Sequence, residues 1–457
     1  MSRFKSRSII LLGVLLTATG CSSRDERPDV LLVVVDGCRP DKLGSYGFGK
    51  PTSPAIDALA ADPDSVVFER HYVQADWTKP STASLFTGLY VYQHRVAVGP
   101  EPVDMPTWSA IMPDDYTTMA ERFQHAGYFT FGAVTIPHLL PKYGFDQGFE
   151  QYGYYRSDAI VRDETLKIIE NAPRPFFGYL HLLGCHNPYP QYDRDAAYME
   201  EFGFEYDEDS REGAGVNFSV PVLTPVTDDA VWNDDDVRFL HLIHEAKLRK
   251  LDRTILEPLF ERLREEGAYD DTLLVVTADH GQELLEHGGT GHGHALWEEV
   301  VHVPLLIKFP AGRRPRELGP RWTAPTRAID LYPTLLTTAG VRVNETLPGV
   351  DLSAAPEIDL VLAERAKEDV RVDAATIRGK QKILHTLGEP PAVFDLAQDP
   401  GETRDLAATS KEAIDAADRA VLALRSKYPI PEVNLDPSTP QLTDEQREAL
   451  RSLGYIE

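Results

Sequence analysis

One short stretch combines a helix start with a hydroxyl that could attack an ester. It reads "ADWTKPSTASLFTG", from Ala75 to Gly88. Proline suits the first turn of a helix because its missing N–H would have no partner there, so Pro80 indicates a start near Thr78, and Gly88 can end the helix. The Thr78 hydroxyl is therefore expected at the mouth of a helix, whose free amides favour negative charge on the group it attacks.

Three further side chains are of the kind that binds metal ions. Asp36 ends the apolar run "DVLLVVVDG", and Asp279 with His280 ends the run "DTLLVVTADHG". Alone, each residue has a common structural role as a loop cap or a turn. Together with the Thr78 hydroxyl they predict a site for one divalent cation, which would lower the pKa of the hydroxyl and make it a nucleophile.

The sequence around these residues predicts an α/β fold with a mostly parallel sheet flanked by helices. Buried strands are expected where apolar runs recur, and a helical spacing of apolar residues separates them, most clearly in residues 237–266. Sites in such sheets form at the carboxyl ends of the strands. The expected strands are 29–37, 128–134, 174–183, 271–281 and 303–309.

The chain is predicted to divide into five segments. An acidic stretch, residues 191–236, breaks the α/β pattern and is expected to be a long surface loop, with an active-site lid as the alternative. Short strands and an amphipathic helix (410–428) indicate a small C-terminal α+β subdomain with an antiparallel sheet. The segments are a signal peptide (1–20), a tether (21–28), a catalytic domain (29–350), the C-terminal subdomain (351–428), and a linker with a terminal helix (429–457).

The composition argues against one class of partner, and the N-terminus indicates an exported protein. The 457 residues carry a formal charge of −26, which argues against nucleic acid as a partner because a polyanion would be repelled. A basic start, a short apolar run and small residues precede Cys21, as in a bacterial lipoprotein signal. Cys21 is therefore expected to carry a lipid anchor in the cell envelope; an ordinary cleaved signal is the alternative.

A set of motifs in residues 29–457 resembles the sulfatase family of the alkaline phosphatase superfamily. The resemblance implies that Asp36, Asp279 and His280 are metal ligands and that Thr78 is the nucleophile and a further ligand. Calcium is the usual ion of the family, but His280 stands where many sulfatases have Asn, which favours Zn²⁺ or Mn²⁺. The motifs are "VVVDGCRPDKLGSYG", "TKPSTASLFTG", "LHLLGCHNPY", "TADHGQELLEHG", "HVPLLIKFP" and "VFDLAQDPGETRDLA".

The same resemblance implies contacts with the substrate. His186 corresponds to a histidine beside the ester and its leaving group, and His292 falls where many sulfatases carry a lysine that holds the ester oxygens. Arg39 matches the arginine of the first metal motif. His186 and His292 are therefore candidate catalytic residues, and all three are candidate substrate contacts; a loop histidine bonded to backbone is the alternative for the two imidazoles.

The nucleophile motif departs from the family pattern. Sulfatases have cysteine or serine in Cys-X-Pro-Ser-Arg, which is oxidised to formylglycine, whereas this chain reads Thr-Lys-Pro-Ser-Thr from Thr78. Threonine cannot become formylglycine. Gly37 replaces the second acid of the first metal pair, and the family's Gly-Lys-Trp-His segment is missing. A plain alkoxide forms a stable ester that must be attacked at its central atom, which is a common route in phosphoryl transfer.

The expected function is metal-dependent hydrolysis of sulfate or phosphate esters, with a small molecule, a glycan or a lipid as the substrate. An envelope transferase of the phosphoethanolamine or phosphoglycerol type is the first alternative, and a non-catalytic binding protein that kept the fold is an alternative of another class. Cys38 and Cys185 flank the expected site in sequence, so the two thiols are predicted to approach bridging distance; two buried free thiols are the alternative.

Overall fold

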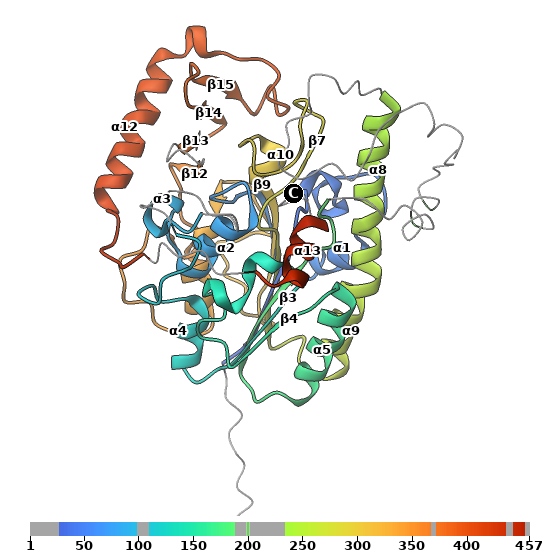
Figure 1. The fold of residues 1–457 in the computed structure, drawn as a ribbon. Coiled ribbons are helices and arrows are strands. Elements are labelled where there is room, and N and C mark those ends of the chain that lie inside the picture. Colours follow the sequence, from blue (N-terminus) through green and yellow to red (C-terminus); the bar gives the residue numbers. More distant parts are fainter. Residues whose placement is uncertain are drawn as a thin grey trace, which may run out of the picture.

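The protein is described by a computed structural model over residues 27–97, 109–187, 198, 201, 234–366, 372–435 and 442–452. The signal peptide, Cys21 and most of the expected loop at 191–236 lie outside these residues. Within them, a central nine-stranded sheet carries helices on both faces, which confirms the expected α/β architecture (Figure 1). No helix in this part of the chain has the length and hydropathy needed to cross a bilayer.

The strands of the large sheet run mostly parallel. Strand β1 lies between β5 and β6 and is parallel to both, while β9 runs antiparallel to its neighbours β6 and β2. The order is β10-β2-β9-β6-β1-β5-β3-β4, with β11 also paired to β2. The bounds are β1 (Asp29–Val35), β2 (Ser65–Tyr72), β3 (Phe129–Val134), β4 (Gln151–Tyr154), β5 (Phe176–Leu182), β6 (Thr272–Thr277), β9 (His302–Lys308), β10 (Arg321–Trp322) and β11 (Thr326–Arg327).

Strand β1 is buried on both sides, which explains its unbroken apolar sequence. Leu31 and Val33 pack into a core shared with α1, α5, α8 and α9, whereas Leu32 and Val34 pack into a second core shared with α2, α4 and α11. The alternation follows from the two-residue period of a strand. The sheet is thus the middle layer of three.

The outer layers contain the helix expected at 237–266, with one interruption, and the helix expected to start near Thr78, together with further helices whose positions were not predicted. The amphipathic run at 237–266 forms α8 and α9, joined by a π-helical turn at Asp252–Leu256. The bounds are α1 (Pro54–Ala60), α2 (Thr78–Thr87), α3 (Val91–His94), α4 (Met119–His125), α5 (Asp158–Asn171), α8 (Asp234–Leu251), α9 (Glu257–Glu265), α10 (Glu298–Val301), α11 (Leu331–Thr338), α12 (Lys411–Lys427) and α13 (Asp444–Ser452).

A four-stranded antiparallel sheet with α12 against it forms one end of the molecule (Figure 1). Its strands are β12 (Val361–Ala366), β13 (Val372–Arg378), β14 (Gln381–His385) and β15 (Ala392–Asp395). The turn between β13 and β14 contains Gly379 at φ 59°. In the last helix, Thr443 and Gln446 exchange main-chain to side-chain hydrogen bonds, which form a capping box.

A buried ion-pair network joins the small sheet to the catalytic part of the chain. The Lys382 ammonium lies 3.2 Å from a Glu298 carboxylate oxygen and 2.9 Å from a Glu402 oxygen. The side chains of Lys382 and Glu402 are fully buried. Removing the lysine would leave the glutamates without their counter-charge, so we expect Lys382→Ala to lower the free energy of unfolding by about 3–5 kcal/mol.

Denaturant unfolding followed by tryptophan fluorescence measures this effect. The exposed Lys411 at the start of α12 provides the matched control, because Lys411→Ala removes a solvated charge and should leave the unfolding midpoint unchanged. Equal midpoints for Lys382→Ala and the wild type would contradict the structural role of the network.

Candidate active site

Three polar segments meet at the carboxyl ends of neighbouring strands. Asp36 follows β1, Asp279 and His280 follow β6, and His186 follows β5. Val34 of β1 is paired with Thr277 of β6, so the segments beyond these strands lie side by side. All four side chains are buried, none more than 2% exposed. The sheet topology therefore brings together the residues that the sequence places far apart.

The carboxylates of Asp36 and Asp279 converge on one imidazole. The His280 Nε2 atom lies 3.3 Å from Asp36 Oδ1 and 3.5 Å from Asp279 Oδ2. Asp36 Oδ1 and both carboxylate oxygens of Asp279 accept no hydrogen bond within the described part of the chain. Burial, together with the neighbouring Asp279 charge, raises the pKa of Asp36 well above its usual value. Buried carboxylate oxygens without donors beside an imidazole fit a divalent cation, which would satisfy them.

His181 belongs to the same cluster and was not anticipated from the sequence. Its Nε2 atom lies 3.4 Å from Asp36 Oδ2 and 3.6 Å from Asp279 Oδ2, and its Nδ1 atom lies 2.7 Å from the Tyr179 hydroxyl. His181 stands inside β5, opposite Val34 of β1. The signal that could have revealed it is an imidazole within an otherwise apolar strand sequence. His181 is placed either to ligate an ion or to orient the two carboxylates.

Thr78 is the first residue of α2, and its hydroxyl faces the carboxylate cluster. The Thr78 Oγ1 atom lies 3.4 Å from His280 Nε2. One turn later, the Ser81 hydroxyl donates to the Asp279 carbonyl over 2.5 Å, which ties the helix to the loop after β6. Gly88 ends the helix at φ 68°, as expected. A buried hydroxyl at a helix N-terminus beside an imidazole and two carboxylates has the surroundings of an activated nucleophile.

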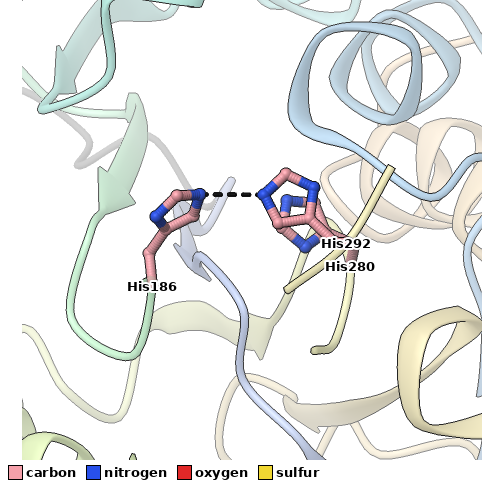
Figure 2. A group of neighbouring side chains, drawn as sticks. All are labelled: His186, His280 and His292. Carbon is pink, nitrogen blue, oxygen red and sulfur yellow. Dashed lines mark hydrogen bonds between the residues drawn. The ribbon is translucent and has the colours of Figure 1, made fainter. Parts of the chain in front are cut away.

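A short hairpin brings His292 to the same place. Strands β7 (Glu283–Leu284) and β8 (Thr290–Gly291) pair antiparallel, and the Gly293 amide donates to the Asp76 carbonyl just before α2. The His292 Nε2 atom lies 2.9 Å from His186 Nε2, and its ring stacks on His280 with centroids 3.9 Å apart (Figure 2). The next histidine, His294, instead pairs with Glu283. The structure thus selects His292 as the site residue.

Gly37 and Arg39 have structural partners in the loop after β1. Gly37 has φ +70°, and a Cβ atom there would lie 3.1 Å from Gln282 Oε1 and 3.4 Å from His186 Cα. This close packing accounts for a glycine where the family pattern has an acid. The Arg39 guanidinium pairs with Asp41 at 2.9 Å and with Glu286 at 2.5 Å. A direct contact between Arg39 and the substrate remains a prediction.

The two cysteines near the site contact one another as free thiols. Both are buried, and Cys185 hydrogen-bonds with Cys38, which together with burial raises the pKa of the Cys185 thiol. The disulfide itself stays a prediction.

Treating the protein with a small-molecule disulfide under mild denaturant should give a Cys38–Cys185 linked peptide in a non-reducing digest. Recovery of only mixed disulfides at both positions would contradict the pairing.

Comparisons with known proteins agree with this geometry. The chain is 24% identical to a delta 4,5-hexuronate-2-O-sulfatase of Bacteroides thetaiotaomicron, over 87% of this chain and 88% of that protein. It is 26% identical to arylsulfatase A of Bos taurus, over 87% of both proteins. The fold matches a phosphonate monoester hydrolase of Agrobacterium radiobacter with a TM-score of 0.68 at 21% identity, over 88% of this chain and 96% of that chain.

The three-layer fold with its acid, imidazole and hydroxyl groups at the strand ends is that of the alkaline phosphatase superfamily. Within this superfamily the chain belongs to the sulfatase family, whose model matches residues 28–341. It is a hydrolase of sulfuric or phosphoric esters.

Proposed function

We propose that this enzyme cleaves phosphoric and sulfuric esters with Thr78 as the nucleophile and that one divalent ion is held by Asp36, Asp279 and His280. The observation that carries the proposal is the position of the Thr78 hydroxyl, 3.4 Å from His280 Nε2, at the N-terminus of α2. The same imidazole nitrogen lies within 3.5 Å of both carboxylates. A nucleophile and a candidate ligand set therefore share one buried space.

The donor set supports a transition-metal ion rather than calcium. Calcium prefers six to eight oxygen ligands, whereas His280 contributes a nitrogen, which suits Zn²⁺ or Mn²⁺. When bound, the ion would lower the pKa of the Thr78 hydroxyl and neutralise charge on the ester. The three protein ligands and the threonine would then make a compact site of about four donors.

The reaction that we propose has two displacements. In the first, the Thr78 hydroxyl loses its proton and its Oγ atom bonds to the phosphorus or sulfur atom while the bond to the leaving oxygen breaks, and that oxygen takes up a proton and departs as the alcohol. In the second, water loses a proton as it attacks the same central atom, the bond to Thr78 Oγ breaks, and Oγ regains its proton. His292 stacks on His280, the neighbour of Thr78, and His186 faces both of them, so His186 and His292 are placed where they can contact the ester oxygens or the leaving group.

The names of the relatives support a proposed substrate class, and the N-terminal residues support a proposed location. Two relatives are sulfatases by name, one of them acting on a hexuronate, so a sulfated glycan or a small ester is the proposed substrate class. The basic, apolar and small residues before Cys21 support export and lipid anchoring in the cell envelope.

A matched substrate panel tests the proposal. A threonine ester of phosphate is more readily attacked at its central atom than the corresponding sulfate, so aryl phosphates, phosphodiesters and phosphonate monoesters should turn over faster than the matched aryl sulfate. The panel is run with Zn²⁺, Mn²⁺ and Ca²⁺ added to metal-free protein. Multiple turnover of the aryl sulfate at or above the rate of its phosphate analogue would contradict the inference from threonine chemistry.

A further inference from the structure

Strand β5 carries two polar side chains, Tyr179 and His181, beside the carboxylate cluster. Residues two apart in a strand share one face of the sheet, so both side chains point the same way. The Tyr179 hydroxyl lies 2.7 Å from His181 Nδ1, and His181 Nε2 lies 3.4 Å from Asp36 Oδ2 and 3.6 Å from Asp279 Oδ2. Both residues are fully buried. Polar contacts therefore run without a break from the phenol of Tyr179 to both carboxylates.

Aromatic packing fixes the position of the Tyr179 ring. The Phe86 ring of α2 meets it edge to face, with the ring centroids 4.7 Å apart, and the Phe149 ring lies 6.3 Å away. Aromatic pairs at such distances and angles stabilise one another. A shift of the Tyr179 ring would break these contacts, so its hydroxyl is held against His181. The helix that carries Thr78 is thus packed on the same phenol that contacts the carboxylate cluster through His181.

The two imidazoles beside the carboxylates have different partners at Nδ1. His280 Nδ1 lies 2.8 Å from the Gly281 carbonyl, which only accepts, so Nδ1 carries the proton and Nε2 presents a lone pair that can ligate an ion. His181 Nδ1 instead faces the Tyr179 hydroxyl, which can donate. A neutral imidazole has one N–H, so a hydrogen bond from the phenol to Nδ1 leaves that N–H on Nε2, where it faces Asp36.

A proton on His181 Nε2 also suits the carboxylates that it faces. Asp36 Oδ2 accepts from this nitrogen, whereas Asp36 Oδ1 and both oxygens of Asp279 accept no hydrogen bond within the described residues. Two buried carboxylates repel one another, and an N–H directed at them offsets part of that repulsion, whereas a lone pair would add to it. The two oxygens of Asp36 thereby differ: His181 holds Oδ2, and Oδ1, 3.3 Å from His280 Nε2, is left for an ion.

We infer that His181 is a positioning residue for the ion site rather than one of its ligands, and that Tyr179 fixes the tautomer in which His181 Nε2 donates to Asp36 Oδ2. The inference rests on the proposed function, because it concerns the same ion. Hydrogen-bond partners of this kind orient ligating carboxylates, and their removal costs about 10–100-fold in metal affinity. The Tyr179 hydroxyl thus acts on ion binding through His181.

Zinc affinity, measured on the full-length protein by competition with a chromophoric chelator, tests the inference without relying on activity. We expect His181→Ala to bind Zn²⁺ about 10–100-fold more weakly than the wild type, and Tyr179→Phe, which keeps the ring packing, about 10-fold more weakly. His181→Gln places an amide N–H near the position of Nε2, so it should regain much of the affinity that His181→Ala loses. Circular dichroism checks that each variant folds.

Tyr128 provides the matched control for the loss of a buried phenol. It precedes β3, at the opposite edge of the sheet from the site, and its hydroxyl donates to the Ala339 carbonyl over 3.1 Å. The residue is 1% exposed. Tyr128→Phe should therefore keep the zinc affinity of the wild type. An equal loss of affinity in Tyr128→Phe and Tyr179→Phe would overturn the role of Tyr179, because it would reflect general damage to the core.

X-ray absorption at the zinc edge separates a positioning residue from a ligand. We expect the same number of imidazole nitrogens around zinc in the wild type and in His181→Gln, and one fewer in the variant would make His181 a ligand. Zinc affinity unchanged in folded His181→Ala or Tyr179→Phe, or as weak in His181→Gln as in His181→Ala, would overturn the inference and leave the proposed ion intact. No tight zinc binding in the wild type would overturn both.

Discussion

Replacing Thr78 by alanine is expected to lower kcat for an aryl phosphate by on the order of 10³-fold or more, because the covalent route loses its nucleophile. The side chain is fully buried and small, so its removal should leave the fold and the carboxylate cluster in place. Steady-state kinetics with the metal content of each preparation measures the effect. An unchanged metal content would show that the lower kcat arises in the chemical step rather than from weaker ion binding.

Serine at position 78 provides the matched control for this prediction. Thr78→Ser keeps the hydroxyl at the start of α2 and removes one methyl group, so it should retain part of the activity. Alanine and serine variants with the same rate would indicate that the hydroxyl does not react. A rate close to the wild type in the alanine variant would exclude Thr78 as the nucleophile.

The second large effect is expected at Asp279. Asp279→Ala removes two buried carboxylate oxygens that lack hydrogen-bond donors within the described residues, and it should abolish tight binding of the ion held with Asp36 and His280. Turnover should fall with it by on the order of 10³-fold or more, as expected when the charge that stabilises the transition state is lost. Elemental analysis and activity are measured on the same sample.

A buried acid outside the site controls for general damage. Asp252 is 1% exposed and accepts hydrogen bonds from the amides of Ala55 and Ile56. Asp252→Asn keeps one of these two acceptor oxygens and replaces the other by an NH2 group, so it perturbs a buried acid away from the site, and the folded variant should keep its metal content and turnover. Undiminished metal in Asp279→Ala would contradict the ligand role of this residue.

The strands and their carboxyl ends could be predicted from the sequence because a strand buried on both faces has a nearly continuous run of apolar residues. The apolar runs that form β1 and β6 are each followed within two residues by an acid, and this pattern made Asp36 and Asp279 candidate site residues. The start of α2 could be predicted because Pro80 fixes its own φ at a helical value, and its end because Gly88 permits the left-handed conformation that stops a helix. These signals act within a few residues, so a single sequence carries them.

Other features of the site depend on contacts between segments that are distant in the sequence, so local sequence patterns predict them less well. His181 lies inside β5 and reaches the site because of its register against β1, which no local pattern specifies. His292 could be proposed only from its place in the family pattern; the β7–β8 hairpin brings it to the site, while the nearby His294 pairs with Glu283. Glycine is favoured at position 37 by its φ of +70° and by the close approach of Gln282 Oε1, which is distant in sequence.

The proposed covalent intermediate gives the most direct test of the central claim. The metal-loaded enzyme is mixed with an aryl phosphate, quenched in acid during turnover, digested and analysed by peptide mass spectrometry, with Thr78→Ser treated in parallel. We expect phosphothreonine at position 78 in the wild type and phosphoserine at the same position in the variant. Sustained turnover without phosphate on Thr78 at any quench time, or with phosphate on another residue, would contradict this expectation.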